Sequence, residues 1–422
     1  MKFSLLASNA KILIYGYGDE GRSTEKFFKE NYPQFKISLF DENKTEPEFL
    51  KPGFKFQDFD LIVRSPGVPR EKIDAPTNKI TSQVELFFEN LSESERQKTI
   101  GITGTKGKST TTKFCAELLQ NTGRTVAIAG NFGVPPLDVL PAFQKGEYDF
   151  VILELSSFQL EHLSNSPHIA ILLNLYRDHL ERHQTVEKYH AAKSNLFRHQ
   201  HADDFLIVPE ETGAFLDMTL FKGRCIFSST IQESLFPETS VFRALHFRQN
   251  FGTMKSLCDI LKIPETLLQK TAHEFQGLPH RMEIFTEKNG IQFVNDSIAS
   301  NPSASLAAVK FFGKKLGSII LGGRPSGDSW TELLQVIKTQ TNALVLLPDG
   351  DSLEVIQKTL ADIQFPHQRV IHQKNFEEIV EAGLSHTPKG KVCLLSPGAK
   401  SFDKFPNYKE KGNTFKKLVN AL

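Results

Sequence analysis

The sequence predicts an α/β fold in three domains, each built around a mainly parallel sheet. Three observations predict it. Apolar segments of strand length alternate with helical patterns along most of the chain, which is typical of parallel sheets. Two glycine-rich turns, at residues 16–21 and 104–107, each stand between a strand pattern and a helix pattern. The length of 422 residues, at ~150 residues per domain, corresponds to two or three domains.

The first expected domain covers residues 1–92 and has the alternating pattern of a Rossmann-like domain. The polar segment 91–98 (LSESERQK) is its expected boundary with the next domain. Its predicted elements are a strand within 11–18 (KILIYGYG), a helix within 22–31 (RSTEKFFKEN), and strands within 35–41 (FKISLFD) and 59–67 (FDLIVRSPG).

The second expected domain covers residues 93–278 and has the pattern of a P-loop-type ATPase domain with a parallel sheet. Near-continuous apolar runs in this segment are typical of central parallel strands that are buried on both faces. The predicted elements are a strand at 99–103, a helix from Ser109 to about Gln120, buried strands within 148–155 and 168–175, and mixed short strands over about 205–245.

The third expected domain covers residues 279–422 and follows a linker at Gly277–Arg281. It alternates strands with helices again, so we expect a second Rossmann-like α/β domain. Its predicted strands lie within 291–297, 316–323, 342–350 and 391–398, and its predicted helices begin at Pro302 and Trp330 and after the strand within 342–350.

Composition excludes several classes of function. The chain has 50 Lys+Arg and 49 Asp+Glu, and this balance argues against non-specific binding of nucleic acid. It contains no apolar run of ~18 residues, so we expect no membrane span. The apolar start at 3–7 is shorter than the ~7 residues of a secretion signal. The four cysteines lie far apart with no CxxC pair, which favours a reducing, cytoplasmic environment.

The segment GITGTKGKSTTT (101–112) has the pattern of a phosphate-binding turn. Its glycines allow backbone N–H groups to point at an anion, and the following helix adds a partial positive charge. A lysine here can reach the β- and γ-phosphates of a nucleotide, and a hydroxyl can bind Mg²⁺. The predicted nucleotide contacts are Gly104, Thr105, Gly107, Lys108, Ser109 and Thr110.

Three further side chains are candidates for the same site. Glu154 ends an apolar strand beside the phosphate-binding strand, where nucleotide enzymes hold Mg²⁺, although a strand-end charge can also face water. Lys193 shares one helical stripe with Tyr189 and Leu196, so it either extends to the surface or points into the site. His179 follows a buried strand and is either structural or a ligand at the same sheet edge.

The first glycine turn has the pattern of a dinucleotide fingerprint. Gly16, Gly18 and Gly21 follow a strand, and Asp41 stands after the next strand, where the fingerprint places a ribose-binding acid. The pattern predicts a nucleotide-like ligand here without identifying it as NAD.

At this point the chain resembles a known family. The segments that carry the resemblance are GTKGKST (104–110), ELSSFQLE (154–161), GLPHR (277–281), NDS at Asn295, and LLSPGAKSFDKF (394–405), in the order in which that family has them. The sequence is therefore identified as similar to the muramyl (Mur) ligases over essentially its whole length.

The resemblance implies an ATP-dependent ligase of peptidoglycan precursor synthesis. ELSSFQLE and the SFDKF block favour the member that adds D-glutamate to UDP-N-acetylmuramoyl-L-alanine through an acyl phosphate, with ATP and two Mg²⁺ ions. We expect a monomer whose domains close about hinges near Lys98 and Gly277. The alternatives are a sibling ligase for another amino acid, an NAD-dependent dehydrogenase built on the first turn, and a nucleotide-binding switch without catalysis.

The resemblance also assigns roles to individual residues. It implies that the UDP end of the substrate contacts the N-terminal domain and that Lys193 is carbamylated to support the second Mg²⁺. The implied positions are Gly16, Gly18, Gly21, Asp41, Ser65 and Gly67 for the UDP end; Asn131 near the reacting end; Lys108 and Ser109 for the ATP phosphates and Mg²⁺; Glu154, His179 and Lys193 for metal and substrate; Arg281 and Asn295 for ATP; and Ser401 and Tyr408 for D-glutamate.

The sequence departs from the pattern of the family at several positions. Lys106 stands where Asn is usual, Glu20 where Thr is usual, and Asp41–Asn43 replaces a DTR sequence. A lysine is often found near the position of Ser326. We expect these changes to alter the contacts to phosphates and substrate.

Overall fold

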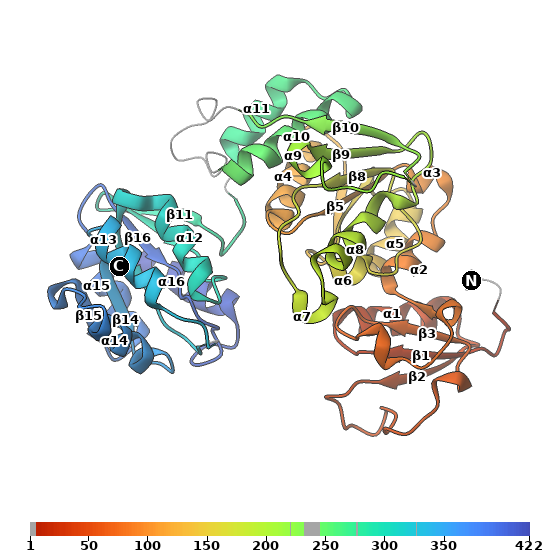
Figure 1. The fold of residues 1–422 in the computed structure, drawn as a ribbon, viewed down its shortest axis with the longest axis horizontal. Helices are drawn as coiled ribbons and strands as arrows, with labels where there is room; N and C mark the ends of the chain where they lie inside the picture. The colour runs from red at the N-terminus through yellow and green to blue at the C-terminus, as the bar shows by residue number, and fades with distance from the viewer. Residues whose placement is uncertain (1–5, 220, 232–244, 276, 326) are drawn as a thin grey trace. The chain divides into compact units, whose positions relative to one another are not determined.

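The computed structural model describes residues 6–219, 221–231, 245–275, 277–325 and 327–422. The chain divides into two compact units, Met1–Phe275 and Gln276–Leu422, and three sheets organise them. The first two sheets belong to the first unit and the third sheet to the second unit (Figure 1). The α/β class expected from the alternating pattern is confirmed.

The N-terminal sheet has four parallel strands, and its strands coincide with the predicted apolar segments. Consecutive side chains of the first strand, such as Ile12 and Leu13, point to opposite faces of the sheet. Both are fully buried, because helices cover one face and aromatic residues cover the other. In sheet order the strands are β2 (Lys36–Phe40), β1 (Lys11–Tyr15), β3 (Leu61–Arg64) and β4 (Ile80–Thr81), and the helices are α1 (Asp19–Asn31) and α2 (Gln83–Glu89).

The central sheet has six parallel strands with the phosphate-turn strand in its middle. Because Ile102 pairs with Glu154 and Thr103 with Leu172, the ends of the three inner strands meet at one edge. In sheet order the strands are β10 (Arg224–Ser228), β9 (Phe205–Pro209), β8 (Ile169–Leu172), β5 (Thr99–Thr103), β7 (Phe150–Glu154) and β6 (Val126–Gly130).

Helices cover both faces of this sheet, and each face has its own apolar core. Short helices α3 (Glu93–Arg96), α6 (Ser157–Leu160), α7 (Leu180–His183) and α9 (Glu210–Gly213) join the strands. The longer helices are α4 (Lys108–Gln120), α10 (Leu245–Leu261) and α11 (Glu265–Glu274) on one face, and α5 (Pro136–Gln144) and α8 (Val186–Arg198) on the other.

The expectation of mixed short strands over 205–245 is wrong in part. Two strands form there, but α9 lies between them and α10 begins at Leu245, while residues 232–244 lie outside the described part of the chain. The sequence pattern did not predict α10, because polar residues interrupt its apolar stripe, which consists of Phe251, Met254 and Leu257.

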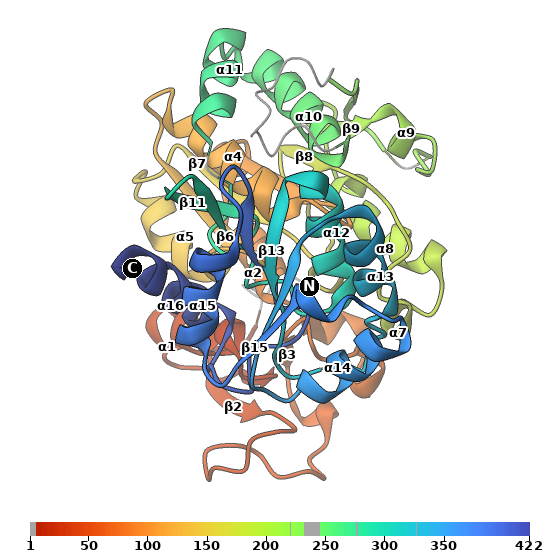
Figure 2. The same ribbon diagram turned by 90° about the vertical axis from the view of Figure 1, so that its left-hand side faces the viewer.

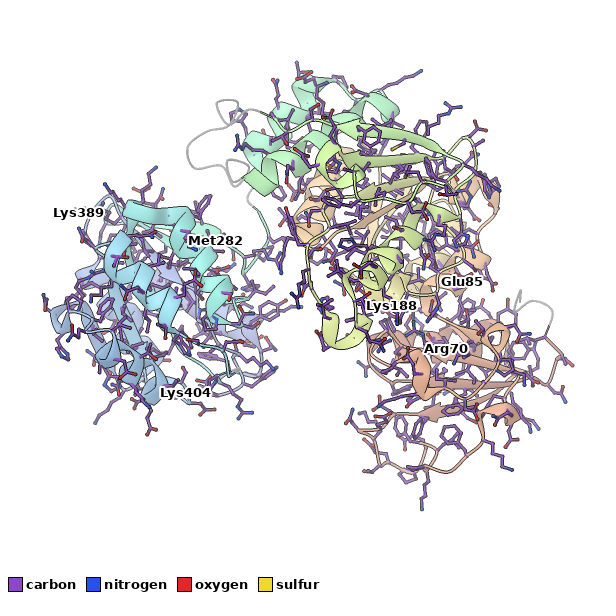
Figure 3. All side chains as sticks on the ribbon, in the orientation of Figure 1. Arg70, Glu85, Lys188, Met282, Lys389 and Lys404 are labelled. Carbon is purple, nitrogen blue, oxygen red and sulfur yellow. The ribbon has the colours of Figure 1, made fainter. Side chains whose placement is uncertain are left out.

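The N-terminal and central domains are packed into one unit. Their helices share a single apolar core, and polar contacts reinforce it. Glu85, labelled in Figure 3, accepts hydrogen bonds from Ser164 N (3.0 Å) and Asn165 Nδ2 (2.8 Å), and Ser23 Oγ donates to Asp138 Oδ1 at 2.7 Å. These contacts fix the first glycine turn against the central domain.

The second unit is a six-stranded sheet with helices on both faces. Neighbouring residues such as Ile319 and Ile320 point to opposite cores, as strand geometry requires. Figure 2 shows α12 and α13 on one side of the strands and α15 and α16 on the other. In sheet order the strands are β11 (Glu283–Lys288), β12 (Ile291–Asn295), β16 (Val392–Leu395), β13 (Leu316–Ile320), β14 (Leu344–Pro348) and β15 (Val370–Gln373), and the helices are α12 (Pro302–Phe312), α13 (Thr331–Gln340), α14 (Leu353–Asp362), α15 (Phe376–His386) and α16 (Tyr408–Ala421).

The sequence pattern did not predict β11, which is antiparallel to β12. Its side chains are only half-buried and carry charges, so it lacks the apolar run of a central strand. A tight turn at Asn289 and Gly290, both with positive φ, joins the two strands. Across the described residues, no helix has the length and apolar character needed to cross a bilayer.

Candidate functional site

The glycine turn between β5 and α4 has the backbone geometry of a phosphate cradle. Gly104 has φ 157° and Gly107 has φ 85°. The positive φ of Gly107 favours glycine, and a Cβ there would lie 2.3 Å from Asn250 Nδ2, so the Asn250 side chain would have to move. Gly107 is the N-cap of α4 and supplies no side-chain hydrogen bond. The first N–H groups of α4 therefore face the turn without a side-chain cap, as an anion site requires.

Lys108 lies over this turn. Its Nζ donates to Gly104 O at 3.1 Å and to Thr105 O at 3.2 Å. Ser109 follows in the first turn of α4 and Thr110 is buried. The predicted contacts Gly104 to Thr110 thus lie together at one end of a helix, with a cation beside them.

The backbone of Lys106 is held on both sides by Asn174. Lys106 N donates to Asn174 Oδ1 at 2.8 Å, and Asn174 Nδ2 donates to Lys106 O at 2.9 Å. The Lys106 side chain is exposed, with its Nζ 3.6 Å from Asp178 Oδ2. The extra cation in the turn therefore points to solvent and has an acidic neighbour.

Lys193 is buried beneath the same turn. Its side chain is 1% exposed, and its Nζ donates to Gly104 O at 2.8 Å and lies 4.9 Å from the centre of the Tyr189 ring. Burial, with a smaller contribution from the charge of Lys108, lowers the pKa of Lys193 well below its usual value. Of the two alternatives left open by the sequence, the structure has the side chain pointing inward.

Glu154 lies next to the cradle, at the end of β7. Its Oε1 accepts a hydrogen bond from Asn131 Nδ2 at 2.7 Å, and its buried Oε2 has no hydrogen-bond partner in the described residues. An oxygen that is buried without a donor fits a cation ligand, because an unpaired buried carboxylate oxygen is costly.

His179 is less enclosed than Glu154. It caps α7 with φ 51°, and its Nδ1 lies 3.3 Å from Glu181 Oε1. Among the residues that the structure describes, no three His, Cys, Asp or Glu side chains gather as a metal site.

Sequence reasoning missed Asn250, on α10. It is buried against the cradle, and neither its Oδ1 nor its Nδ2 has a hydrogen-bond partner in the described part of the chain. A buried amide without partners is expensive, so Asn250 is a candidate for contact with a ligand. The one feature of the sequence that distinguishes Asn250 is its position directly before Phe251, the first residue of the apolar stripe of α10.

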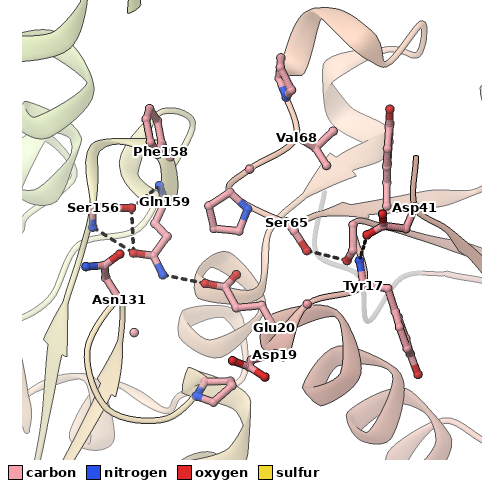
Figure 4. A pocket seen from close by; sticks show the side chains of 18 of the residues that line it. Tyr17, Asp19, Glu20, Asp41, Ser65, Val68, Asn131, Ser156, Phe158 and Gln159 are labelled. Atoms are coloured by element: carbon pink, nitrogen blue, oxygen red, sulfur yellow. Dashed lines mark hydrogen bonds between the residues drawn. The ribbon is translucent and has the colours of Figure 1, made fainter. Parts of the chain in front are cut away.

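A cavity of about 590 Å³ lies between the N-terminal and central domains (Figure 4). It is lined by the first glycine turn and by the segment 65–69, together with residues of the central domain. The sequence-predicted residues that line it are Gly16, Gly18, Asp41, Ser65, Gly67 and Asn131.

The first glycine turn is tightly constrained. Gly16 has φ 90°, and a Cβ on Gly21 would lie 2.3 Å from Gly16 O, so helix and strand meet as the fingerprint requires. Ser65 Oγ donates to Gly16 O at 2.7 Å, and Tyr17 N donates to Asp41 Oδ2 at 2.7 Å. Asp41 thus holds the turn in shape while it lines the cavity.

Acidic side chains line this cavity, and Lys72 is the cation among its lining residues. Lys72 Nζ is paired with Glu42 at 2.7 Å, which also accepts from Tyr15 Oη at 2.5 Å. The hydrogen bond from Lys72 lowers the pKa of Glu42. Glu20 differs, because burial raises its pKa to about 7.

In the second unit, Asn295 is fully buried and its hydrogen bonds are internal. Asn295 Nδ2 lies 3.0 Å from His280 Nδ1 and donates to Glu283 Oε2 at 3.1 Å, while Ser297 N donates to its Oδ1 at 3.2 Å. Arg281 is half-buried next to this network. The structure thus gives Asn295 a role in shaping the strand end.

Ser401 lies on the loop after β16, and its buried Oγ has no hydrogen-bond partner in the described residues. Lys400 directly precedes Ser401 in the chain, and an isolated antiparallel bridge pairs Lys400 with Arg324. Two cationic residues therefore belong to the backbone around Ser401. Tyr408 begins α16, and its carbonyl accepts from Ser297 Oγ at 2.9 Å. The position of Ser326 lies outside the described residues.

The buried lysine Lys411 was also missed by sequence reasoning. Its Nζ donates to Gly322 O at 2.7 Å, and burial lowers its pKa to about 8. Asp403, on the same loop as Ser401, has a buried Oδ1 without a partner in the described residues. Lys411 therefore fixes the end of β13 beside a loop with two unsatisfied polar atoms.

Comparison with known proteins matches both units of the chain. The family models of the Mur ligase middle domain and the "Mur ligase, glutamate ligase domain" match residues 102–255 and 280–398. A UDP-N-acetylmuramoylalanine--D-glutamate ligase of Lawsonia intracellularis is 32% identical over 415 residues, which cover 97% of this chain and 91% of that protein. A ligase of the same name from Thermoanaerobacter sp. (strain X514) is 29% identical, with 98% of each chain covered.

Solved structures agree on the fold. MurF from Acinetobacter baumannii has a TM-score of 0.61 at 17% identity, with 94% of this chain and 98% of that chain covered. MurF ligase from Thermotoga maritima, in complex with ADP, has a TM-score of 0.55 at 16% identity, with 99% and 98% covered. The phosphate cradle lies within the first matched segment, and the Lawsonia relative aligns over nearly the whole chain, so this chain belongs to the Mur ligase family.

Proposed function

We propose that this chain, as a cytoplasmic monomer, joins D-glutamate to the alanine carboxylate of UDP-N-acetylmuramoyl-L-alanine and converts ATP to ADP and phosphate. The product is a precursor of peptidoglycan. One observation carries the proposal: a glycine cradle with Lys108 over it, in a chain that aligns end to end with D-glutamate ligases. A dehydrogenase would give that cradle no role.

The three expected domains divide the substrates between them. Residues 1–92 bind the UDP end in the cavity between the first two domains, and residues 93–278 bind ATP at the cradle. Residues 279–422 bind D-glutamate near the loop of Ser401, whose buried hydroxyl is unsatisfied in the described chain. The unpaired amide of Asn250 supports a nucleotide contact at the cradle.

The first chemical step requires a carboxylate to approach a triphosphate, and the obstacle is repulsion between negative charges. Lys108 and the N–H groups at the start of α4 offset this repulsion without reorganising, because the turn already holds them in place. The carboxylate oxygen then bonds to the γ-phosphorus, the bond to ADP breaks, and an acyl phosphate forms.

The donor set at the cradle fits Mg²⁺, which prefers oxygen ligands. Ser109, Glu154 and His179, together with carbamylated Lys193, would hold it, and the unpaired Oε2 of Glu154 supports this assignment. Bound Mg²⁺ would supply positive charge to the phosphate oxygens. Burial favours the uncharged form of the Lys193 amine, which is the form that can add to CO₂ with loss of one proton and so gain a carboxylate.

In the second step, the amine of D-glutamate attacks the acyl carbon and phosphate leaves. Positioning and exclusion of water dominate here, because water competes for the acyl phosphate. We propose that the second unit closes for this step about a hinge at Gly277, because Lys98 lies inside the first unit, whose two domains share one apolar core. Gly277 has φ 77° and lies next to the boundary between the two units.

Phosphate release tests the proposal. Release from ATP should require UDP-N-acetylmuramoyl-L-alanine and D-glutamate together. Equal turnover of ATP without either substrate would overturn the proposed reaction. A panel with L-alanine, a diamino acid or D-alanyl-D-alanine in place of D-glutamate separates this ligase from its siblings. With UDP-N-acetylmuramoyl-L-alanine and ATP present, we expect turnover with D-glutamate and with none of the other three.

A further inference from the structure

Glu20 is an unsatisfied group in the cavity that we propose for the UDP end of the substrate. Among the residues that line this cavity, Glu20 Oε2 is the buried polar atom without a hydrogen-bond partner. Its other oxygen, Oε1, accepts from Gln159 Nε2 of the central domain at 2.7 Å. Figure 4 shows Glu20 reaching from α1 toward Gln159.

The backbone around Glu20 is fixed, and the hydrogen bond from Gln159 holds one oxygen of its carboxyl in place. Thr24 Oγ1 and Gln83 Nε2 both donate to Glu20 O, at 2.7 and 2.9 Å. Glu20 lies in the first turn of α1, a 13-residue helix whose N-cap, Gly18, supplies no side-chain cap. A Cβ on Gly18 would meet nothing within 4 Å, so the space before the helix is open.

This location is where an anionic ligand would sit. A helix N-terminus with free N–H groups favours phosphate oxygens, and the diphosphate is the anionic part of a UDP-linked substrate. An ionised Glu20 at the same place would repel it. A neutral carboxyl has the opposite effect, because its O–H can donate a hydrogen bond to a phosphate oxygen.

The charges around Glu20 do not force it to ionise. Arg64 of β3 favours the ionised form, and the Gln159 amide does so by donation, but burial outweighs both. Asp19 beside it pairs with Arg22, and Asp138 of the adjacent α5 accepts from Ser23 Oγ at 2.7 Å. The resulting pKa of about 7 leaves a neutral form available at physiological pH.

We propose that Glu20 determines substrate affinity by binding the UDP-linked substrate in its neutral form, with the carboxyl proton donated to a diphosphate oxygen. The inference rests on the proposed function, since it takes the UDP-linked substrate as the occupant of the cavity. Binding is then coupled to proton uptake whenever Glu20 is ionised beforehand. A negative ligand also favours the neutral carboxyl, so the bound state keeps its proton at higher pH.

The coupling fixes the sign and size of the pH dependence. Below pH ~7 the carboxyl is already neutral and affinity does not change with pH. Above it, each pH unit weakens binding by about tenfold, until the bound form also loses its proton. Neither the diphosphate nor the alanine carboxylate takes up a proton in this range, so the slope belongs to the protein.

Isothermal titration calorimetry with UDP-N-acetylmuramoyl-L-alanine alone, between pH 6 and 8.5, tests this on the full chain. Titrations in two buffers of different ionisation enthalpy count the protons taken up. For the unaltered chain we expect a flat Kd up to about pH 7, a rise of about tenfold from pH 7.5 to 8.5, and uptake that approaches one proton. A Kd that does not change with pH overturns the inference.

Two variants assign the proton to Glu20. Glu20→Gln keeps an acceptor for Gln159 and a permanent donor, so its Kd should stay near the low-pH value and proton uptake should vanish. Glu30→Gln, at an exposed position on the same helix, should keep the original profile. Persistence of the slope in Glu20→Gln overturns the assignment. Absence of binding at every pH and in every variant overturns the proposed function itself, and the inference with it.

Discussion

Replacing Lys108 by methionine removes the charge over the cradle while leaving the turn in place. Met keeps most of the length of the side chain. Gly104 O, one of the two acceptors of Lys108 Nζ, still accepts from Lys193 Nζ at 2.8 Å. We therefore expect a folded protein with an unchanged unfolding temperature and a damaged first chemical step.

The expected size follows from the charge that is lost. Two unit charges 4 Å apart at an effective dielectric constant near 20 interact by ~4 kcal/mol. Removal of one preorganised donor to developing charge costs about 10²- to 10³-fold in kcat in other enzymes. The helix N-terminus remains and contributes ~0.3–1 kcal/mol, so ATP still binds. We expect kcat to fall by about 10²- to 10³-fold with a smaller change in the KM for ATP.

Steady-state phosphate release, with ATP and UDP-N-acetylmuramoyl-L-alanine varied separately, measures both parameters. Lys113→Met is the matched control, because Lys113 lies on the same helix and pairs with Glu117 instead of facing the turn. It should retain nearly full activity. A Lys108→Met variant whose kcat stays within threefold of the original would refute the electrostatic role of Lys108.

Three further predictions concern other parts of the molecule. Gly21→Ala places a Cβ 2.3 Å from Gly16 O, so the first turn must open. In calorimetry, the Kd for UDP-N-acetylmuramoyl-L-alanine should rise about tenfold or more, while the Kd for ADP should stay unchanged. An equal loss of affinity for both ligands would indicate general damage to the fold. Lys193→Ala should lower kcat by about 10- to 100-fold, with partial recovery on addition of short carboxylates such as acetate; full activity without them contradicts the metal-supporting role. Burial lowers the pKa of Lys411 from 10.5 to about 8. Between pH 8 and the pKa of this lysine in the unfolded chain, the unfolded chain binds more protons than the folded one, so the free energy of unfolding rises with pH. The total rise should be about 3 kcal/mol relative to Lys411→Met. Denaturant unfolding followed by the fluorescence of Trp330, the single tryptophan, measures this in the second unit, and parallel pH profiles of the two proteins would contradict it.

Much of the fold follows from local sequence patterns. The segments that form β7 and β8 are near-continuous apolar runs, and such runs have few alternatives to a buried parallel strand. Glycines at positive φ mark the two turns. The half-exposed strand β11 and the helix α10 carry weaker patterns, so they could be identified only with the neighbours they pack against.

The candidate site was predictable where one turn or one stripe supplies it. Lys108 and Ser109 follow the glycines directly, and the helical spacing of Lys193 assigns it to an apolar stripe, although it does not decide whether the side chain points inward. Partners distant in sequence were not predictable. Gln159 lies 139 residues from Glu20, and only the fold brings these two side chains together.

The same reasoning explains the missed residues in the second unit. Lys411 and Gly322 lie 89 residues apart, and nothing near either position in the sequence signals a buried lysine. The motif of Asn295 predicts a contact to ATP, and its hydrogen bonds to Glu283 and Ser297, which the motif does not indicate, are set by the fold of the second unit. Long-range packing, which local sequence patterns do not show, decides what the polar atoms of such residues contact.

The central claim is that a carboxylate oxygen of the substrate attacks the terminal phosphorus of ATP held over the Lys108 cradle. Transfer of ¹⁸O tests it most directly. With both alanine carboxylate oxygens of UDP-N-acetylmuramoyl-L-alanine labelled, one turnover with ATP and D-glutamate should release inorganic phosphate that carries one ¹⁸O, because the bridging oxygen of the acyl phosphate leaves with phosphorus. Phosphate without label, accompanied by amide product, would contradict the account.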